Sequence, residues 1–150
     1  MPQSLVYNYT HIVFSTKDRY PFIDKQISTE LFNYLGGTCR ELNCNPIIVG
    51  GHNDHVHLIV LLSQKIALMK LMEIIKSHSS KWIKTKGKKY ETFFWQKGYG
   101  AFSINPTQID VVCEYVKEQS KHHQNKSFKD EYSAFLKKYN VKYDERYVWD

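Results

Sequence analysis

PIIVGGHNDHVHLIVLL, the stretch from residue 46 to residue 62, contains two short runs that are typical of β-strands. Residues 46–50 and 55–62 are rich in β-branched and other apolar side chains. Between them, residues 51–54 (GHND) have the composition of a turn. The stretch therefore predicts a β-hairpin.

The segments before the hairpin add a strand and a helix. Residues 6–15 are rich in β-branched and aromatic side chains and end at the polar residues 16–19, which predicts a strand followed by a loop. Apolar side chains recur at close to helical spacing over 24–42. Gly36 and Gly37 weaken the middle of this predicted helix.

The segments after the hairpin complete the pattern. Apolar residues recur at intervals of three and four over 68–83, with lysines on the opposite face, and Gly87 ends this second helix. A strand is expected over 93–104, a helix over 107–122 and a further helical segment over 128–139. The order is strand, helix, strand, strand, helix, strand, helix. It predicts a ferredoxin-like α+β fold with a four-stranded antiparallel sheet and a short helical C-terminal extension.

Length and composition indicate one globular domain over residues 1–150. The chain is 42% hydrophobic and 24% charged, which excludes a disordered tail, a collagen-like fibre and a disulfide-stapled mini-protein. Its longest apolar run, 58–62, is far shorter than the roughly 20 residues of a membrane helix, and its first residues do not resemble a signal peptide. We therefore expect a soluble, cytoplasmic protein without a membrane partner. Cys39, Cys44 and Cys113 contain no CxxC pair and are expected to be free thiols.

The positive charge is concentrated in one part of the chain. The net charge is +6, and residues 66–100 contain eight lysines and only two acidic residues, so this segment accounts for the whole excess. Such a concentration is typical of a protein that binds a phosphate backbone, although a solvated lysine-rich helix and loop would look the same. The candidate backbone contacts are Lys76, Lys81, Lys84, Lys88 and Lys89.

The sharpest chemical feature is Asp54-His55-Val56-His57 at the start of the third predicted strand. Because successive side chains of a strand alternate, His55 and His57 point to one face, about 7 Å apart. They can bind one divalent ion if a third ligand approaches from a neighbouring element. With seven histidines in the chain, the spacing alone is weak evidence. Asp54 is a candidate partner that orients one histidine, or simply a turn residue. His11 is expected to be a structural histidine.

A second candidate pair is Tyr115 and Gln119 on the third predicted helix. Residues four apart share a helical face, so the phenol and the carboxamide should meet the same neighbour. A phenol with a pKa near 10 is a poor nucleophile unless a cation or a base stabilises the phenolate. Beside a metal ion that also polarises a phosphate, Tyr115 becomes a plausible nucleophile. Considered alone, the pair favours a structural role over a catalytic one.

Taken together and in this order, the motifs resemble a known family. They are His55-Val56-His57, the stretch WQKGYGAFS at 95–103, and YVKEQ at 115–119 followed by His122-His123. The chain is similar to the small single-tyrosine HUH transposases, the TnpA-like enzymes of insertion sequences that move as single-stranded DNA. The resemblance extends from residues 9–14 to the tail at 143–148.

The resemblance implies a role for each of these residues and a single HUH transposase domain over 1–150. It implies that His55, His57 and Gln119 bind the divalent ion, Mg²⁺ or Mn²⁺, and that Tyr115 is the nucleophile. The implied reaction is cleavage and rejoining of single-stranded DNA through a 5′-phosphotyrosine intermediate, without a nucleotide cofactor. The implied partners are DNA hairpins near element ends and a second copy of the chain, whose tyrosine helix can complete the active site.

Two alternatives stay open at this point. Ferredoxin-like sheets with aromatic residues and lysines also bind single-stranded nucleic acid without chemistry. A host-adopted HUH nuclease that no longer transposes would carry the same residues.

Overall fold

A four-stranded antiparallel sheet forms the centre of the computed structural model, which describes residues 2–123 and 126–150. The strand order is β2-β3-β1-β4. The strands are β1 (Tyr9–Ser15), β2 (Asn45–Gly51), β3 (His55–Leu61) and β4 (Gly100–Ser103). The helices are α1 (Ser28–Glu41), α2 (Leu68–Lys84), α3 (Ile109–Lys117), α4 (Gln119–His122) and α5 (Phe128–Lys138). Three short 3₁₀ turns connect them: η1 (Lys17–Arg19), η2 (Lys88–Tyr90) and η3 (Pro106–Gln108).

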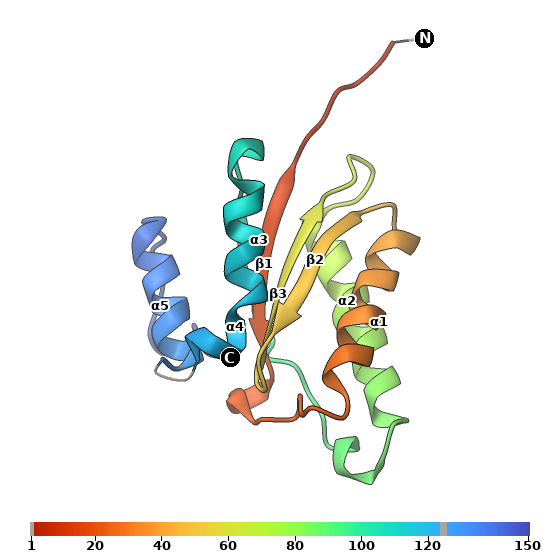
Figure 1. Ribbon diagram of the computed structural model, residues 1–150, viewed down its shortest axis with the longest axis vertical. Coiled ribbons are helices and arrows are strands. Elements are labelled where there is room, and N and C mark those ends of the chain that lie inside the picture. The colour runs from red at the N-terminus through yellow and green to blue at the C-terminus, as the bar shows by residue number, and fades with distance from the viewer. Residues whose placement is uncertain (1, 124–125) are drawn as a thin grey trace.

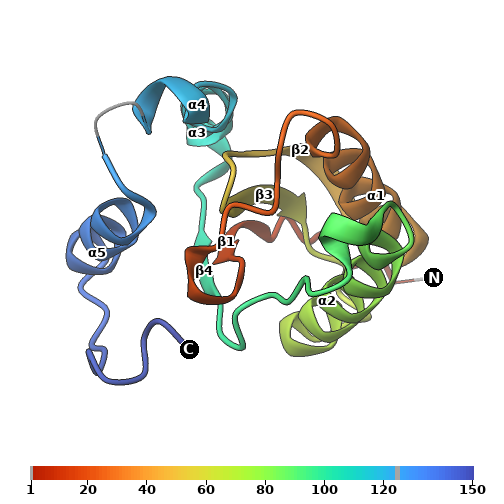
Figure 2. The same ribbon diagram turned by 90° about the horizontal axis from the view of Figure 1, so that it is seen from below.

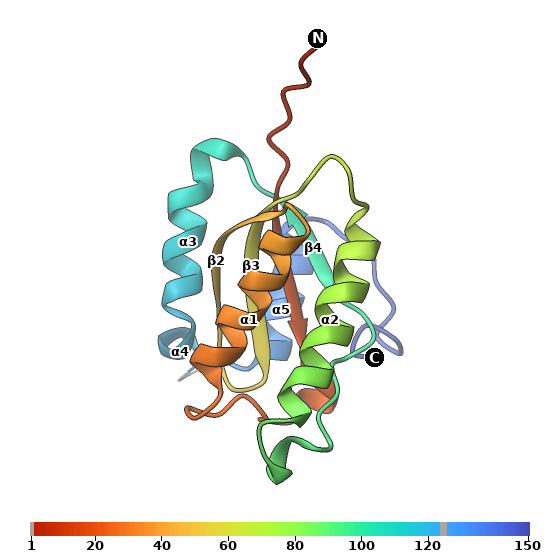
Figure 3. The same ribbon diagram turned by 90° about the vertical axis from the view of Figure 1, so that its right-hand side faces the viewer.

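The helices cover the two faces of the sheet in separate layers. α1 and α2 lie side by side on one face, and α3, α4 and α5 lie on the other (Figures 1 and 2). Viewed from the α1 and α2 side, the sheet stands between this pair and α5 (Figure 3). The element order and the antiparallel sheet confirm the predicted ferredoxin-like α+β fold.

The predicted hairpin of β2 and β3 is confirmed. The two strands pair from Asn45 opposite Leu61 to Gly51 opposite Val56. β1 pairs with the other edge of β3 over its whole length. β3 is therefore a central strand, and its side chains are covered on both faces.

The main core fills the space between the sheet and the α1–α2 layer. It contains alternate strand residues such as Val56 and Leu58, which are fully buried. α1 continues through Gly36 and Gly37, which were expected to weaken it. Gly36 is buried against β2, where an added Cβ would lie 3.7 Å from Val49. This close packing of α1 on the sheet offsets the low helix propensity of glycine, which costs about 1 kcal/mol relative to alanine.

A smaller core holds α5 against β1 and β4. It consists of the buried residues Val13, Phe102, Phe128, Tyr132 and Leu136. Ser127 caps α5, because its hydroxyl accepts a hydrogen bond from the Asp130 amide at 3.2 Å.

Two predicted elements differ in extent from those observed. The strand expected over 93–104 is reduced to β4 and an isolated bridge between Trp95 and Thr16, and the backbone over residues 96–99 leaves the regular pairing between them. The helix expected over 107–122 is interrupted at Glu118, whose backbone (φ −94°, ψ 17°) separates α3 from α4.

The cysteines and the membrane expectation can also be compared with the structure. Cys39, Cys44 and Cys113 are free thiols, as expected. Within residues 2–123 and 126–150, no helix combines the length and the apolar character needed to span a bilayer.

Candidate metal and nucleophile site

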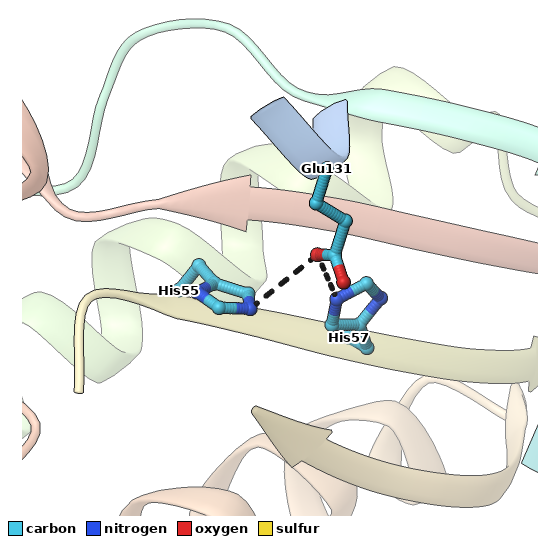
Figure 4. Close-up of side chains that lie close together, drawn as sticks. All are labelled: His55, His57 and Glu131. Atoms are coloured by element: carbon cyan, nitrogen blue, oxygen red, sulfur yellow. Dashed lines mark hydrogen bonds and ion pairs between the residues drawn. The ribbon is translucent and has the colours of Figure 1, made fainter. Parts of the chain in front are cut away.

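His55 and His57 lie on the face of β3 that is covered by α3, α4 and α5. Both side chains are fully buried, and their ring centroids are 5.2 Å apart. The Nε2 atoms of both rings face the carboxylate of Glu131, at 3.6 Å for His55 and 2.9 Å for His57 (Figure 4). The prediction that the two histidines share a face is confirmed.

A hydrogen-bonding partner holds the Nδ1 atom of each ring. His55 Nδ1 lies 2.7 Å from Asp54 Oδ1, and His57 Nδ1 lies 2.8 Å from Nε2 of His11 on β1. Such contacts fix the orientation of an imidazole and leave its other nitrogen available for a cation. Asp54 thus stands where the sequence predicted a partner for one histidine. His11, expected to be only structural, holds the other.

Burial keeps two of these histidines neutral. It lowers the pKa of His11 to about 3, an effect to which the neighbouring His57 adds. Burial also lowers the pKa of His57, although its hydrogen bond to Glu131 opposes the shift. A neutral imidazole is the form that binds a metal ion, so burial of His57 favours this role.

Tyr115 and Gln119 reach the histidines from α3 and α4. Gln119 is buried, and its Oε1 lies 2.8 Å from His55 Nε2, while its Nε2 donates to Glu131 Oε2 at 3.2 Å. The Tyr115 hydroxyl donates to the same Glu131 oxygen. The two side chains therefore share a neighbour, as their spacing predicted. They do so across the helix break at Glu118, where Gln119 Nε2 also donates to the Tyr115 carbonyl at 3.4 Å.

Burial and the contact with Glu131 raise the pKa of Tyr115 above its ordinary value. The phenol is therefore protonated at neutral pH, and it needs a nearby cation or a proton acceptor to become a nucleophile.

Glu131, on the first turn of α5, is the site residue that the sequence analysis missed. Its side chain is only 3% exposed. Although burial alone would raise the pKa of Glu131, hydrogen bonds from His123 and His57 outweigh that effect and lower it. One ligand atom each from His55, His57 and Glu131 lie within 4.8 Å of one another. From the sequence, Glu131 is only an acidic residue in a predicted helix. The direction in which its side chain points depends on how α5 packs against the sheet, and the sequence pattern does not indicate this.

His123 contacts both Glu131 and His52. Its Nε2 lies 3.2 Å from Glu131 Oε2, and its ring stacks on that of His52 at a centroid distance of 5.5 Å. The side chain of His122, which belongs to the same sequence motif, lies outside the described residues.

The donor atoms gathered here fit a divalent cation. They are two imidazole nitrogens, a carboxamide oxygen and a carboxylate oxygen, all from buried side chains. Mixed nitrogen and oxygen ligands suit ions such as Mn²⁺ and Zn²⁺, and the oxygen donors also suit Mg²⁺.

A pocket opens beside the candidate nucleophile. It has a volume of about 240 Å³ and lies between α3 and α5. Tyr115, Glu131, Phe135 and the exposed lysines Lys126 and Lys138 are among its lining residues. The pocket therefore lies next to two residues of the cluster, Tyr115 and Glu131.

The five predicted DNA-contacting lysines lie elsewhere. Lys76, Lys81 and Lys84 belong to α2 and Lys88 and Lys89 to η2, so the structure does not bring them to the histidine pair. Lys81 and Lys88 are exposed. Contact of these residues with DNA stays a prediction.

Three of these lysines have partners within the protein. The Lys76 ammonium donates to the carbonyls of residues 96, 97 and 98 at 2.8, 3.1 and 2.6 Å, and burial lowers its pKa to about 8. Lys89 pairs with Asp24 at 2.9 Å, and Lys84 donates to Ser80 at 3.0 Å. Lys76 therefore holds the segment that leads into β4, a role that the charge pattern of the sequence does not reveal.

Comparison with known proteins finds a matching family and solved structures with a similar fold. The sequence model of the family described as "Transposase IS200 like" matches residues 4–119. A candidate transposase from Deinococcus radiodurans R1 has a similar crystal structure, with a TM-score of 0.61 at 15% identity, covering 79% of this chain and 96% of that one. A REP-associated tyrosine transposase bound to a REP hairpin has a TM-score of 0.60 at 13% identity, covering 82% and 72%. At these identities the two structures show the fold alone. No curated protein matches the sequence.

Proposed function

The chain belongs to the IS200-like transposase family, and from this premise we propose that it cleaves and rejoins single-stranded DNA through Tyr115. The observation that carries the proposal is the convergence of four side chains on one buried point. His55 and His57 come from a strand, and Tyr115 and Gln119 come from helices about 60 residues later in the chain. A pure binding module has no need for this cluster.

His55, His57 and Gln119 are the proposed ligands of a divalent ion, Mg²⁺ or Mn²⁺. When bound, the ion supplies positive charge against the non-bridging oxygens of the scissile phosphate. Asp54 and His11 hold the two imidazole rings so that both Nε2 atoms face the same point. All three ligand side chains are buried, and electrostatic interactions are stronger in such surroundings than in bulk water.

Tyr115 is the proposed nucleophile. Its Oη forms a bond to phosphorus while the bond from phosphorus to the 3′-oxygen breaks. The phenol loses its proton, and the released 3′-oxygen gains one. The products are a 5′-phosphotyrosine and a free 3′-hydroxyl. A second 3′-hydroxyl reverses the step and joins new ends. Because the phosphodiester bond energy is conserved, the reaction needs no nucleotide cofactor.

The proposed substrate is single-stranded DNA with a hairpin near the element end. The hairpin-bound state of the REP-associated tyrosine transposase supports this choice, as does the net charge of +6.

We propose that one chain assembles the whole site. The Tyr115 and His57 ring centroids are 5.8 Å apart within the same chain, and Gln119 contacts His55 of that chain. We also propose a homodimer. In it, the second subunit would bind a second DNA end, and each subunit would use its own Tyr115.

A covalent-adduct assay tests the proposal. Single-stranded oligonucleotides from the DNA flanking the gene, labelled at the 3′ end, are mixed with the protein and Mg²⁺ or Mn²⁺ and run on a denaturing gel. We expect label at protein mass, lost with EDTA and lost in Tyr115→Phe. DNA binding without an adduct for every oligonucleotide and metal would contradict the proposal and favour a binding module.

A further inference from the structure

Glu131 is a buried carboxylate. In the described part of the chain its ion-pair partners are three histidines, His55, His57 and His123, and no lysine or arginine. A buried charge is costly unless it is paired or coordinates a metal ion. Glu131 therefore lies where a cation held between it and the histidines would be favourable.

The positions of the ligand atoms favour a metal ion as that charge. Glu131 Oε1 is 2.9 Å from His57 Nε2 and 3.6 Å from His55 Nε2, and ligand atoms of the three residues lie within 4.8 Å of one another (Figure 4). Donor atoms bound at about 2.1 Å to one ion lie at most about 4.2 Å apart. Small side-chain movements thus bring all three to a common ion.

The other carboxylate oxygen faces the proposed nucleophile. Glu131 Oε2 accepts hydrogen bonds from the Tyr115 hydroxyl and from Gln119 Nε2. One carboxylate therefore touches the proposed nucleophile with one oxygen and the histidine pair with the other. No other described side chain in the cluster contacts His55, His57, Tyr115 and Gln119 together.

The carboxylate comes from a part of the chain that the family match does not include. That match ends at residue 119, whereas α5 spans Phe128–Lys138. Phe128 and Tyr132, on either side of Glu131 along α5, are buried in the smaller core. Their packing sets the direction of Glu131, so its place in the site follows from the docking of α5.

We propose that Glu131 is a fourth protein ligand of the divalent ion, supplied by α5, and that the same carboxylate positions the Tyr115 hydroxyl. The inference rests on the proposed function, because it assumes the metal ion that His55, His57 and Gln119 would bind. Its consequence is that α5 is part of the active site and not an appendage to the fold.

Metal binding by the free protein tests the inference without reference to catalysis. Wild type, Glu131→Gln and the control Asp130→Asn are freed of metal and titrated with Mn²⁺, with binding followed by calorimetry and by electron paramagnetic resonance. Asp130 is the matched control, because it is an exposed carboxylate on the same turn of α5. We expect at least about a tenfold loss of affinity in Glu131→Gln and wild-type affinity in Asp130→Asn, since even residues that only orient metal ligands change affinity by 10–100-fold.

The outcomes separate this inference from the proposed function. Equal Mn²⁺ affinity in wild type and Glu131→Gln overturns the fourth ligand and leaves the other three intact. Failure of wild type to bind Mn²⁺ or Mg²⁺ overturns the metal site as a whole, and the proposed function with it. The Mn²⁺-induced rise in Tm is a second readout, because a change in the stability of the metal-free protein does not alter it at fixed affinity.

Discussion

Gly100 is the position at which a single added methyl group should disturb both the fold and the site. It lies on β4 where α5 packs, and a Cβ built there would lie 2.7 Å from Cε2 and 2.8 Å from the hydroxyl of Tyr132. Tyr132 is 5% exposed and stacks on Phe128, so its ring cannot simply swing into solvent. Gly100→Ala should therefore push α5 away from the sheet.

The magnitude follows from the cost of overpacking a buried contact, typically about 1–3 kcal/mol. For a protein of this length each kcal/mol lowers Tm by about 2–4 °C, so the expected fall is roughly 2–12 °C. Glu131 precedes Tyr132 directly, so the same displacement should move its carboxylate and weaken Mn²⁺ binding. Gly37→Ala is the matched control, because nothing lies within 4 Å of an added Cβ in the middle of α1. It should stabilise the protein by about 0.5–1 kcal/mol.

Thermal unfolding by circular dichroism and Mn²⁺ titration, run on both variants and wild type, measure these effects. The two substitutions add the same methyl group, so opposite signs of ΔTm can come only from their surroundings. A Gly100→Ala protein with wild-type Tm and wild-type Mn²⁺ affinity would refute the packing of α5 against β4 and the dependence of the site on it.

Three further predictions concern the hydrogen bonds around the site and on the surface. His11→Phe keeps a ring beside His57 but removes the nitrogen that hydrogen-bonds to it, so we expect about a 10–100-fold loss of Mn²⁺ affinity. His11→Gln should restore part of this affinity. Unchanged affinity in His11→Phe would show that His57 needs no hydrogen-bonding partner to bind the ion. If one chain assembles the site, as proposed, mixing Tyr115→Phe with His57→Ala protein should restore no DNA cleavage. Recovered cleavage in the mixture would indicate that subunits share residues. Although partial burial would raise the pKa of Asp24, hydrogen bonds from Lys89, Tyr90 and Ile27 lower it. Asp24→Asn should therefore lower Tm above about pH 4, the ordinary pKa range of an aspartate, and the difference from wild type should vanish as the pH falls through the lowered pKa of the folded protein. A Tm difference that does not depend on pH would contradict this assignment.

Local pattern predicts most of the framework. The hairpin follows from two apolar strands around a turn, and the alternation of strand side chains is sufficient to place His55 and His57 on one face. The four-residue spacing of Tyr115 and Gln119 likewise predicts a shared neighbour, which is Glu131. These are short-range properties of the backbone, and tertiary packing preserves them.

What the sequence could not predict depends on contacts between distant elements. The predicted strand over 93–104 is interrupted at residues 96–98, whose carbonyls accept hydrogen bonds from Lys76 on the distant α2. His11 meets His57 only through the register of β1 against β3. Glu131 enters the site through the packing of α5, which no spacing along the chain encodes. The lysine-rich segment indicates the sign of the charge but not its place in the fold.

Mass spectrometry of the covalent adduct can identify the residue that is bonded to DNA, which is Tyr115 in the proposed reaction. Protein incubated with Mn²⁺ and a cleavable single-stranded oligonucleotide is digested with a protease and a nuclease, and the peptides that carry a nucleotide are sequenced. We expect a nucleotide attached to Tyr115 and to no other residue. A nucleotide on another tyrosine, or cleaved DNA with no modified peptide, would contradict it.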